Sequence, residues 1–233
     1  MNKLFFLYLF YNMAGLKMYN LDTIRKLLIE LEDTIIFSII ERGRHNYPIE
    51  NFATNLKIFC TTYEQNAQIF DYFNTPENIP FFIDLPNKKS IINDEIFNYY
   101  ITSIAPQICY ITNHSLTTDY LKDVNILNLL SKRIHSGLFV AISKFQSDTE
   151  RYQSLIDKNN SNGIMTLLTD LKTEDAVIER VGKKAEIYAN MLNNYQNINY
   201  KNFFKKLYFE FIIPLTKEVE LNYLLSLKTG LDS

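Results

Sequence analysis

Apolar residues recur at intervals of three and four positions along most of the chain, which is the spacing of one face of an α-helix. The pattern starts at residue 21 and predicts a first helix that ends near Gly43, since glycine commonly follows the last helical turn. It predicts further helices over residues 51–73, 93–104, 118–146, 148–158, 164–171, 173–193 and 200–227. We therefore expect an all-α fold, a multi-helix bundle in a single domain.

Prolines and one polar run mark where these helices should end or bend. Pro106 is expected to stop the helix over 93–104, and the run 159–163 is expected to form a turn. Pro214 lies inside the last helix and should kink it, because proline removes one backbone hydrogen bond. Residues 107–118 contain isoleucine, tyrosine and threonine that would also suit a strand, and we interpret them as helical.

The composition narrows the class of protein. A chain of 233 residues can bury a sizeable core in one domain, and 47% hydrophobic residues exclude a disordered chain. Six glycines and six prolines suit long helices better than a β-sandwich. A net charge of −2 predicts no general nucleic-acid-binding surface. Cys60 and Cys109 lie far apart without a neighbouring cysteine or histidine, which excludes a disulfide scaffold and argues against a zinc site.

Residues 1–20 precede the helical pattern, and we treat them as a leader to a domain over residues 21–233. In the leader, Lys3 comes before an apolar run and a stretch that ends in small residues. This order resembles a secretory signal over residues 1–15, and an upstream extension with initiation at Met13 or Met18 explains it equally well. The apolar run is too short to span a membrane as a helix. The extension predicts a cytoplasmic protein, and the signal predicts a secreted one.

The predicted central helix carries two cations among apolar residues. Arg133 and Lys144 are eleven positions apart, which is close to three whole turns, so both point the same way. Their Cα atoms would be separated by about 16 Å along the helix, and their long side chains could hold the two ends of a small dianion. The alternative is a pair of solvated cations on an exposed stripe. Ile134 and Leu138 nearby weigh against that alternative, because a buried charge is costly unless it is paired.

Further polar residues fall on the other predicted helices. Arg25 lies early in the first helix, where a surface arginine is the usual explanation. Asp170 and Glu174 stand four positions apart, as do Thr216 and Glu220, and side chains at that spacing share one helix face. Surface acids are the usual explanation for the pair Asp170 and Glu174.

Several kinds of catalytic chemistry lack their motifs in this sequence. There is no glycine-rich phosphate loop, no Gly-x-Ser-x-Gly nucleophile motif and no glutamate three positions before a histidine. His135 is expected to be a packed, hydrogen-bonded residue rather than a catalytic one. What remains is a set of cations, acids and a hydroxyl on helices. Such a set suits a reaction that depends on positioning and electrostatics without a covalent step.

Several blocks of the sequence resemble the eukaryotic, all-helical chorismate mutases. Residues 21–25 and 32–37 resemble the opening helix of that family, and residues 131–137 and 143–148 resemble its central signature. Residues 163–165, 179–186 and 213–220 complete the resemblance, which runs from residue 21 to residue 227 and leaves the leader uncovered. It implies a Claisen rearrangement of chorismate to prephenate, on the route to phenylalanine and tyrosine, without a cofactor or a metal.

The resemblance also implies roles for individual residues. Chorismate is a dianion, and its breaking C–O bond places negative charge on the ether oxygen in the transition state. Arg25 and Arg133 match the family's arginines that hold the carboxylates, and Thr216 matches a hydroxyl that assists one of them. Lys144 and Glu220 match the donors to the ether oxygen.

Two acids complete the implied site. Glu174 matches a carboxylate that accepts a hydrogen bond from the substrate hydroxyl. Asp170 falls where fungal members carry asparagine and bacterial all-helical members carry aspartate, so we expect its role in binding the hydroxyl to be kept. Two alternatives to a housekeeping enzyme remain: a secreted chorismate mutase acting on a host's pool, and an inactive helical relative that acts as a binding protein. The seven competent residue types argue against the inactive relative.

The resemblance makes two further predictions, on assembly and regulation. Fungal members are homodimers, and we expect a homodimer here. Fungal members also bind tryptophan or tyrosine between subunits, using paired arginines and a Gly-Ser. The corresponding positions here carry Asp71, Tyr72, Thr117 and Thr118, so we expect little response to either amino acid.

Overall fold

The computed structural model describes residues 21–47, 51–67, 92–111, 120–192 and 198–228. The leader and positions 71, 72, 117 and 118 lie outside these residues. Within them the all-α prediction is confirmed, with one pair of two-residue strands. The α-helices are α2 Leu21–Gly43, α3 Phe52–Ala67, α4 Asn93–Tyr99, α5 Ala105–Ile108, α6 Tyr120–His135, α7 Gly137–Ser147, α8 Thr149–Asp157, α9 Ser161–Leu168, α10 Leu171–Met191, α11 Tyr200–Leu207 and α12 Ile213–Ser226.

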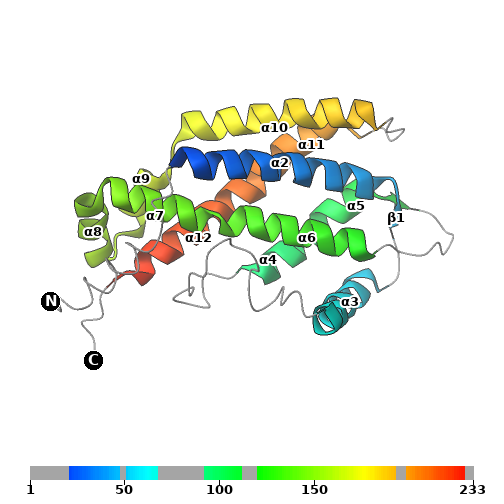
Figure 1. The fold of residues 1–233 in the computed structure, drawn as a ribbon, viewed down its shortest axis with the longest axis horizontal. Helices are drawn as coiled ribbons and strands as arrows, with labels where there is room; N and C mark the ends of the chain where they lie inside the picture. The colour runs from blue at the N-terminus through cyan, green and yellow to red at the C-terminus, as the bar shows by residue number, and fades with distance from the viewer. Residues whose placement is uncertain (1–20, 48–50, 68–91, 112–119, 193–197, 229–233) are drawn as a thin grey trace.

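The long helices pack side by side (Figure 1). α2 contacts both α10 and α6, and α12 crosses behind to contact α7 and α9. The buried face of α2 presents four fully buried isoleucines to this core, Ile35, Ile36, Ile39 and Ile40. A smaller core, which includes Phe145, Ile156, Ile164, Leu168 and Leu224, joins α7, α8, α9 and α12. No described helix is both long and apolar enough to cross a membrane.

The central helix that we predicted over residues 118–146 is two helices that meet at Ser136, so the prediction of one continuous helix was wrong. The hydroxyl of Ser136 donates to the Lys132 carbonyl at 2.6 Å, and the Phe139 N–H donates to the Ser136 carbonyl at 3.1 Å. This tightens one turn between α6 and α7, which remain nearly end to end (Figure 1). Next to the break, Gly137 touches α12, since an added Cβ would lie 2.7 Å from the Thr216 carbonyl oxygen.

Pro106 and Pro214 each lie just after a π-helical segment. Tyr100–Ile104 precedes α5, and Tyr208–Ile212 precedes α12; each following α-helix has its proline in the first turn. The wider turn accommodates the proline ring and its missing N–H without ending the helical path. The prediction that Pro106 stops the helix was therefore wrong. Near Pro214 the regular α-helix is interrupted, as predicted, and the interruption is the π-helical segment Tyr208–Ile212 just before the proline.

Local hydrogen bonding explains the remaining differences. Residues 110–111, which we predicted as helical, form strand β2 (Tyr110–Ile111), parallel to β1 (Asn46–Tyr47), with Asn46 opposite Tyr110. α9 begins inside the predicted turn, because the Asn160 side chain accepts from the Gly163 N–H at 2.9 Å and caps the helix. The first helix has the predicted bounds, Leu21–Gly43. The single helix predicted over residues 200–227 is a run of three segments, α11, the π-helical Tyr208–Ile212 and α12, which together span Tyr200–Ser226.

Candidate active site

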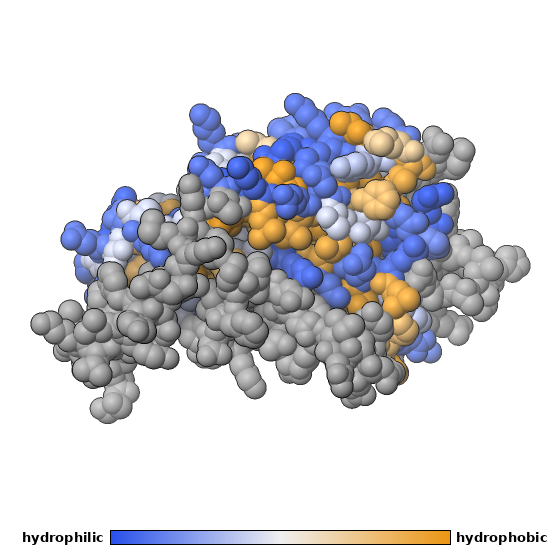
Figure 2. Space-filling model, in the orientation of Figure 1, coloured by the Kyte–Doolittle hydropathy of each residue, from blue (hydrophilic) through white to orange (hydrophobic). Residues whose placement is uncertain are grey.

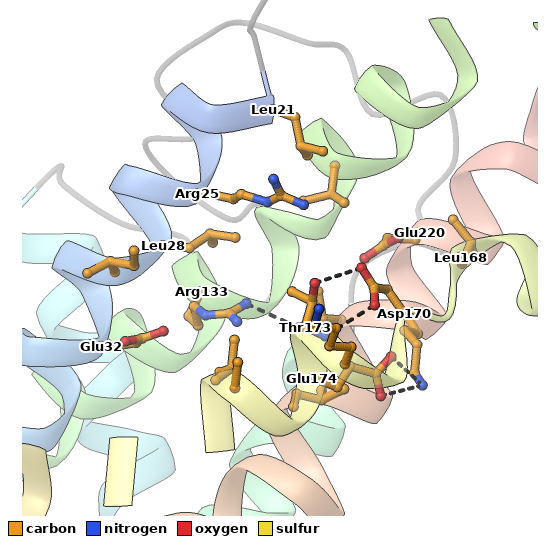
Figure 3. Close-up of a pocket in the computed structure, with 18 of the residues that line it drawn as sticks. Leu21, Arg25, Leu28, Glu32, Arg133, Leu168, Asp170, Thr173, Glu174 and Glu220 are labelled. Atoms are coloured by element: carbon orange, nitrogen blue, oxygen red, sulfur yellow. Dashed lines mark hydrogen bonds and ion pairs between the residues drawn. The ribbon is translucent and has the colours of Figure 1, made fainter. Parts of the chain in front are cut away.

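A cavity of about 500 Å³ lies between α2, α6, α7, α10 and α12 (Figure 3). This volume is in the range of pockets that hold small molecules. The seven residues singled out from the sequence all line it: Arg25, Arg133, Lys144, Asp170, Glu174, Thr216 and Glu220. Residues up to 195 positions apart in the chain therefore meet at one place.

Arg133, from α6, is the cation most deeply set in the cavity wall. Its side chain is only 5% exposed, and its Nη1 donates to the Thr216 hydroxyl at 3.4 Å. Its Nε is buried without a hydrogen-bond partner, and no acid of the described residues forms an ion pair with it. Figure 3 shows the guanidinium pointing into the cavity, as does that of Arg25. The charge of Arg133 acts on Glu220 only from beyond ion-pair distance. A buried cation without a directly bound acid is costly, so this group is prepared for an anionic ligand.

Arg25 differs from Arg133 in its exposure. It lies in the second turn of α2, its side chain is 49% exposed, and it contacts the exposed Asp22 at 3.4 Å. An exposed pair of this kind contributes little stability, because water and salt screen it. Arg25, in the outer part of the cavity, can therefore leave Asp22 and bind a ligand with little loss of stability.

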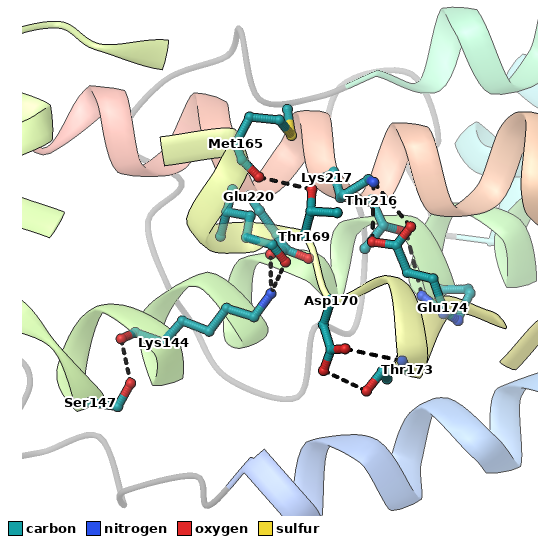
Figure 4. A network of polar contacts seen from close by, with 12 residues as sticks. Lys144, Ser147, Met165, Thr169, Asp170, Thr173, Glu174, Thr216, Lys217 and Glu220 are labelled. Carbon is teal, nitrogen blue, oxygen red and sulfur yellow. Dashed lines mark hydrogen bonds and ion pairs between the residues drawn. The ribbon is translucent and has the colours of Figure 1, made fainter. Parts of the chain in front are cut away.

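Lys144 and Glu220 form a partly buried pair on facing helices (Figure 4). The Lys144 ammonium donates to the Leu168 carbonyl at 2.6 Å and to the Glu220 carboxyl at 3.3 Å. Glu220 is 4% exposed, and burial raises its pKa to about 7 although Lys144 opposes the rise. Near neutral pH a large share of Glu220 is thus protonated and able to donate a hydrogen bond.

Asp170 and Glu174 are held at the start of α10. Asp170 is exposed and caps the helix, accepting from the Thr173 N–H at 3.1 Å and from the Thr173 hydroxyl at 2.6 Å. These hydrogen bonds, led by the hydroxyl, lower the pKa of Asp170, so it is ionised at neutral pH. Glu174 follows in the first turn, and both of its oxygens accept from Lys217 at 3.1 Å.

Sequence reasoning missed several polar residues of the cavity. Lys217 and Lys172 line it, as do Arg180 and Glu32, which form a two-point ion pair at 2.6 and 2.9 Å. Glu32 lies two helical turns after Arg25, and that spacing could have revealed it. Charged residues such as Lys217 carry no comparable signal, since a charge on a helix usually faces solvent.

The charges of the cavity are unbalanced. Six basic and four acidic side chains line it, so positive charges exceed negative ones by two even when Glu220 is ionised, which suits an anionic ligand. Among the described residues no group of three or more His, Cys, Asp and Glu side chains could hold a metal ion. The fold and the cavity together define a helical protein whose site suits a small, doubly negative molecule.

Comparison with known proteins identifies the family. No protein-family model matches the chain. Chorismate mutase of Saccharomyces cerevisiae is 33% identical over 88% of this chain and 94% of its own length. The cytosolic chorismate mutase 2 of Zea mays is 30% identical over 91% of this chain and 97% of its own length. The chain belongs to the chorismate mutase family.

Solved structures agree with this assignment. Chorismate mutase from Candida albicans, in complex with L-Trp, has a TM-score of 0.72 and 30% identity, covering 88% of this chain and 91% of that chain. The chloroplast chorismate mutase from Zea mays has a TM-score of 0.70 and 31% identity, covering 90% of this chain and 96% of that chain. The all-helical architecture is thus shared along nearly the whole domain.

Proposed function

We propose that this chain converts chorismate to prephenate with the seven cavity residues named above. The observation that carries the proposal is Arg133, a buried guanidinium that faces the cavity and has no acidic partner among the described residues. A folded protein tolerates such a charge when a ligand supplies the counter-charge. Competent side chains at all seven positions also favour an enzyme over an inactive relative.

Binding would use the two arginines for the two carboxylates of the substrate. Arg133 and the adjacent Thr216 hydroxyl would hold one carboxylate in the buried part of the cavity, and Arg25 would hold the other. Glu174 and Asp170 would accept hydrogen bonds from the substrate hydroxyl. Fixing both ends selects the compact conformer in which the reacting carbons are close, which removes much of the entropic part of the barrier.

The chemical step would be supported by the pair Lys144 and Glu220. In the rearrangement one C–O bond breaks and one C–C bond forms within the same molecule, so no atom or electron is gained or lost. Negative charge develops on the ether oxygen, and the Lys144 ammonium and a protonated Glu220 are both able to donate to it. Donors fixed in place before the reaction stabilise such charge without reorganisation.

The direct test is the loss of chorismate absorbance when purified protein is added, together with detection of prephenate. We expect turnover by the wild-type chain. A folded wild-type protein that leaves chorismate unchanged would contradict the proposal and favour the inactive relative. Binding of chorismate without turnover would point to the same alternative.

We further propose a cytoplasmic homodimer. Hydrophobic surface gathers over α2 on the face shown in Figure 2, and exposed apolar side chains include Phe37 on α2 and Leu121 on α6. Such surface suits burial against a second copy. Light scattering should give twice the chain mass of 27.4 kDa, and a monomer at micromolar concentration would contradict the dimer. Sequencing the mature N-terminus distinguishes the cytoplasmic form from the secreted one.

A further inference from the structure

One turn of α12 contacts three other helices across the cavity (Figure 4). Thr216 accepts from Arg133 of α6, and Glu220 accepts from Lys144 of α7. Between them, Lys217 donates to Glu174 of α10. In the contacts made by Thr216 and Glu220, both partners have a proposed role toward the substrate. In the contact made by Lys217, only Glu174 has such a role, and Lys217 has none so far.

The contact between Lys217 and Glu174 is symmetric. The Lys217 ammonium lies 3.1 Å from each oxygen of the carboxylate, and each side chain is 21% exposed. A single ammonium placed between both oxygens restricts rotation of the carboxylate and neutralises its charge. It leaves other lone pairs on the same oxygens available as acceptors.

We propose that Lys217 is a positioning residue, which fixes the Glu174 carboxylate as an acceptor for the substrate hydroxyl and cancels its charge toward the incoming dianion. This inference rests on the function proposed above. Without the lysine, the ionised Glu174 would face a doubly negative ligand in a partly desolvated cavity, where repulsion is stronger than in water. Lys217 thereby allows the Glu174 carboxylate to be part of a site that must bind a dianion.

Lys217 could instead leave Glu174 and hold a substrate carboxylate itself, and the two roles predict different couplings. If Lys217 acts through Glu174, the loss caused by Lys217→Met should largely disappear once Glu174→Gln has removed the negative charge. If Lys217 binds the substrate directly, the loss should be the same in both backgrounds. A double-mutant cycle measures this difference.

The experiment compares wild type, Lys217→Met, Glu174→Gln and the double variant by steady-state kinetics with chorismate. We expect Lys217→Met to raise KM by about tenfold with a smaller change in kcat, and to cost at most about twofold in the Glu174→Gln background. Lys217→Arg should bring KM most of the way back to the wild-type value, because arginine keeps the positive charge and reaches both oxygens of Glu174. Lys201→Met is the matched control, since Lys201 joins α11 to Glu186 of α10 at 2.9 Å on the outer surface.

Three outcomes would overturn the inference. Equal losses from Lys217→Met in both backgrounds would assign Lys217 to direct substrate binding. The second outcome is a fall in kcat/KM that follows a lowered melting temperature in both backgrounds, with the same relation in the Lys201→Met control. That result would mean that the pair of Lys217 and Glu174 contributes to stability alone. Absence of turnover by folded wild type would overturn the proposed function together with this inference, whereas wild-type turnover with an additive cycle would overturn this inference only.

Discussion

At the scale of single residues, Arg133 is expected to be needed for activity and to be unfavourable for stability. Its buried guanidinium forms no ion pair among the described residues and acts on Glu220 only from a longer distance, so its burial costs folding free energy that a bound anion would offset. We expect Arg133→Met to lower kcat/KM by at least about a hundredfold, equivalent to roughly 3 kcal/mol. The melting temperature should stay unchanged or rise, because an apolar side chain of similar length fills the same space.

Thermal unfolding and steady-state kinetics on the same preparation test both halves of this prediction. Lys144→Ala should lose activity to a similar extent, and Arg151→Met, which removes an exposed arginine of α8, serves as the control. Near wild-type kcat/KM in the Arg133 variant would show that the substrate binds elsewhere.

Glu220 makes the reaction depend on pH. Its pKa is raised from 4.5 to about 7, so the folded protein holds this proton at pH values where the unfolded chain has lost it. The donor form is present below pH 7 and is lost as the pH rises, and activity should therefore decline through that region. The stability that this carboxyl contributes should be full below its unfolded pKa of 4.5, decline as the pH rises to about 7, and level off above that.

The measurement is the pH profile of kcat/KM for wild type and for Glu220→Gln, whose amide donates at every pH. We expect the variant's profile to be flat where that of wild type falls. A wild-type profile that is already level from acid to mildly alkaline pH would rule out the protonated form as the active one.

Residue by residue, the sequence predicts some cavity positions better than others. Spacing alone predicted that Arg133 and Lys144 point the same way, and both line the cavity although they belong to two helices that meet at Ser136. The two pairs at four-residue spacing were also predicted from spacing, and they line the cavity as well. Lys217 follows from neither, because its partner Glu174 lies 43 positions away on another helix. Only the tertiary fold, which places this turn of α12 within reach of the start of α10, brings the two side chains together.

At the scale of elements, the close contact between α7 and α12 sets the width of the cavity. A Cβ on Gly137 would meet the Thr216 carbonyl oxygen at 2.7 Å, and a backbone atom cannot rotate away as a side chain can. Gly137→Ala should therefore push α12 outward, destabilise the fold by about 1–3 kcal/mol and displace Thr216 and Glu220. We expect kcat/KM to fall further than the stability loss alone would explain.

Gly163→Ala is the matched control for this prediction. Its added Cβ would meet side-chain atoms of Leu155 and Asn160 at 2.8 Å, which are able to shift. Melting temperature and kcat/KM are measured for both variants. Equal, small effects in the two would show that the contact between α7 and α12 is looser than the structure indicates.

Contacts between helices also explain why some helix boundaries were predicted correctly from the sequence and others were not. The 3.6-residue period identifies α2, α8 and α10 because each has one apolar face against one core. The break at Ser136 and the π-helical segments before Pro106 and Pro214 depend on how neighbouring helices pack. His135, by contrast, was correctly predicted as a packed residue: its ring accepts from the Ile92 N–H at 3.3 Å and bonds to the Ser131 carbonyl at 2.8 Å.

At the scale of the whole molecule, the order of the sequence blocks allowed the family fold to be predicted, and no single helix would have done so. The blocks are spread over six helices, α2, α6, α7, α9, α10 and α12, and the described structure brings these helices together around one cavity of about 500 Å³. Periodicity alone could predict helices but not which of them would meet. The order of functional residue types along the chain supplied that information through the resemblance.

Regulation is the property of the whole molecule in which we expect this chain to differ from fungal relatives. An amino-acid effector presents a carboxylate, which needs a cation or free backbone N–H groups. The resemblance implies that Asp71 replaces an arginine of those relatives and that Thr117 replaces a glycine, so we expect a repulsive charge at the first position and a β-branched residue at the second. We expect tryptophan and tyrosine at millimolar concentration to change the rate by no more than about twofold, a coupling of about 0.4 kcal/mol. Initial rates at sub-saturating chorismate, with and without each amino acid, measure this coupling, and a tenfold response to either would mean that other residues form an effector site.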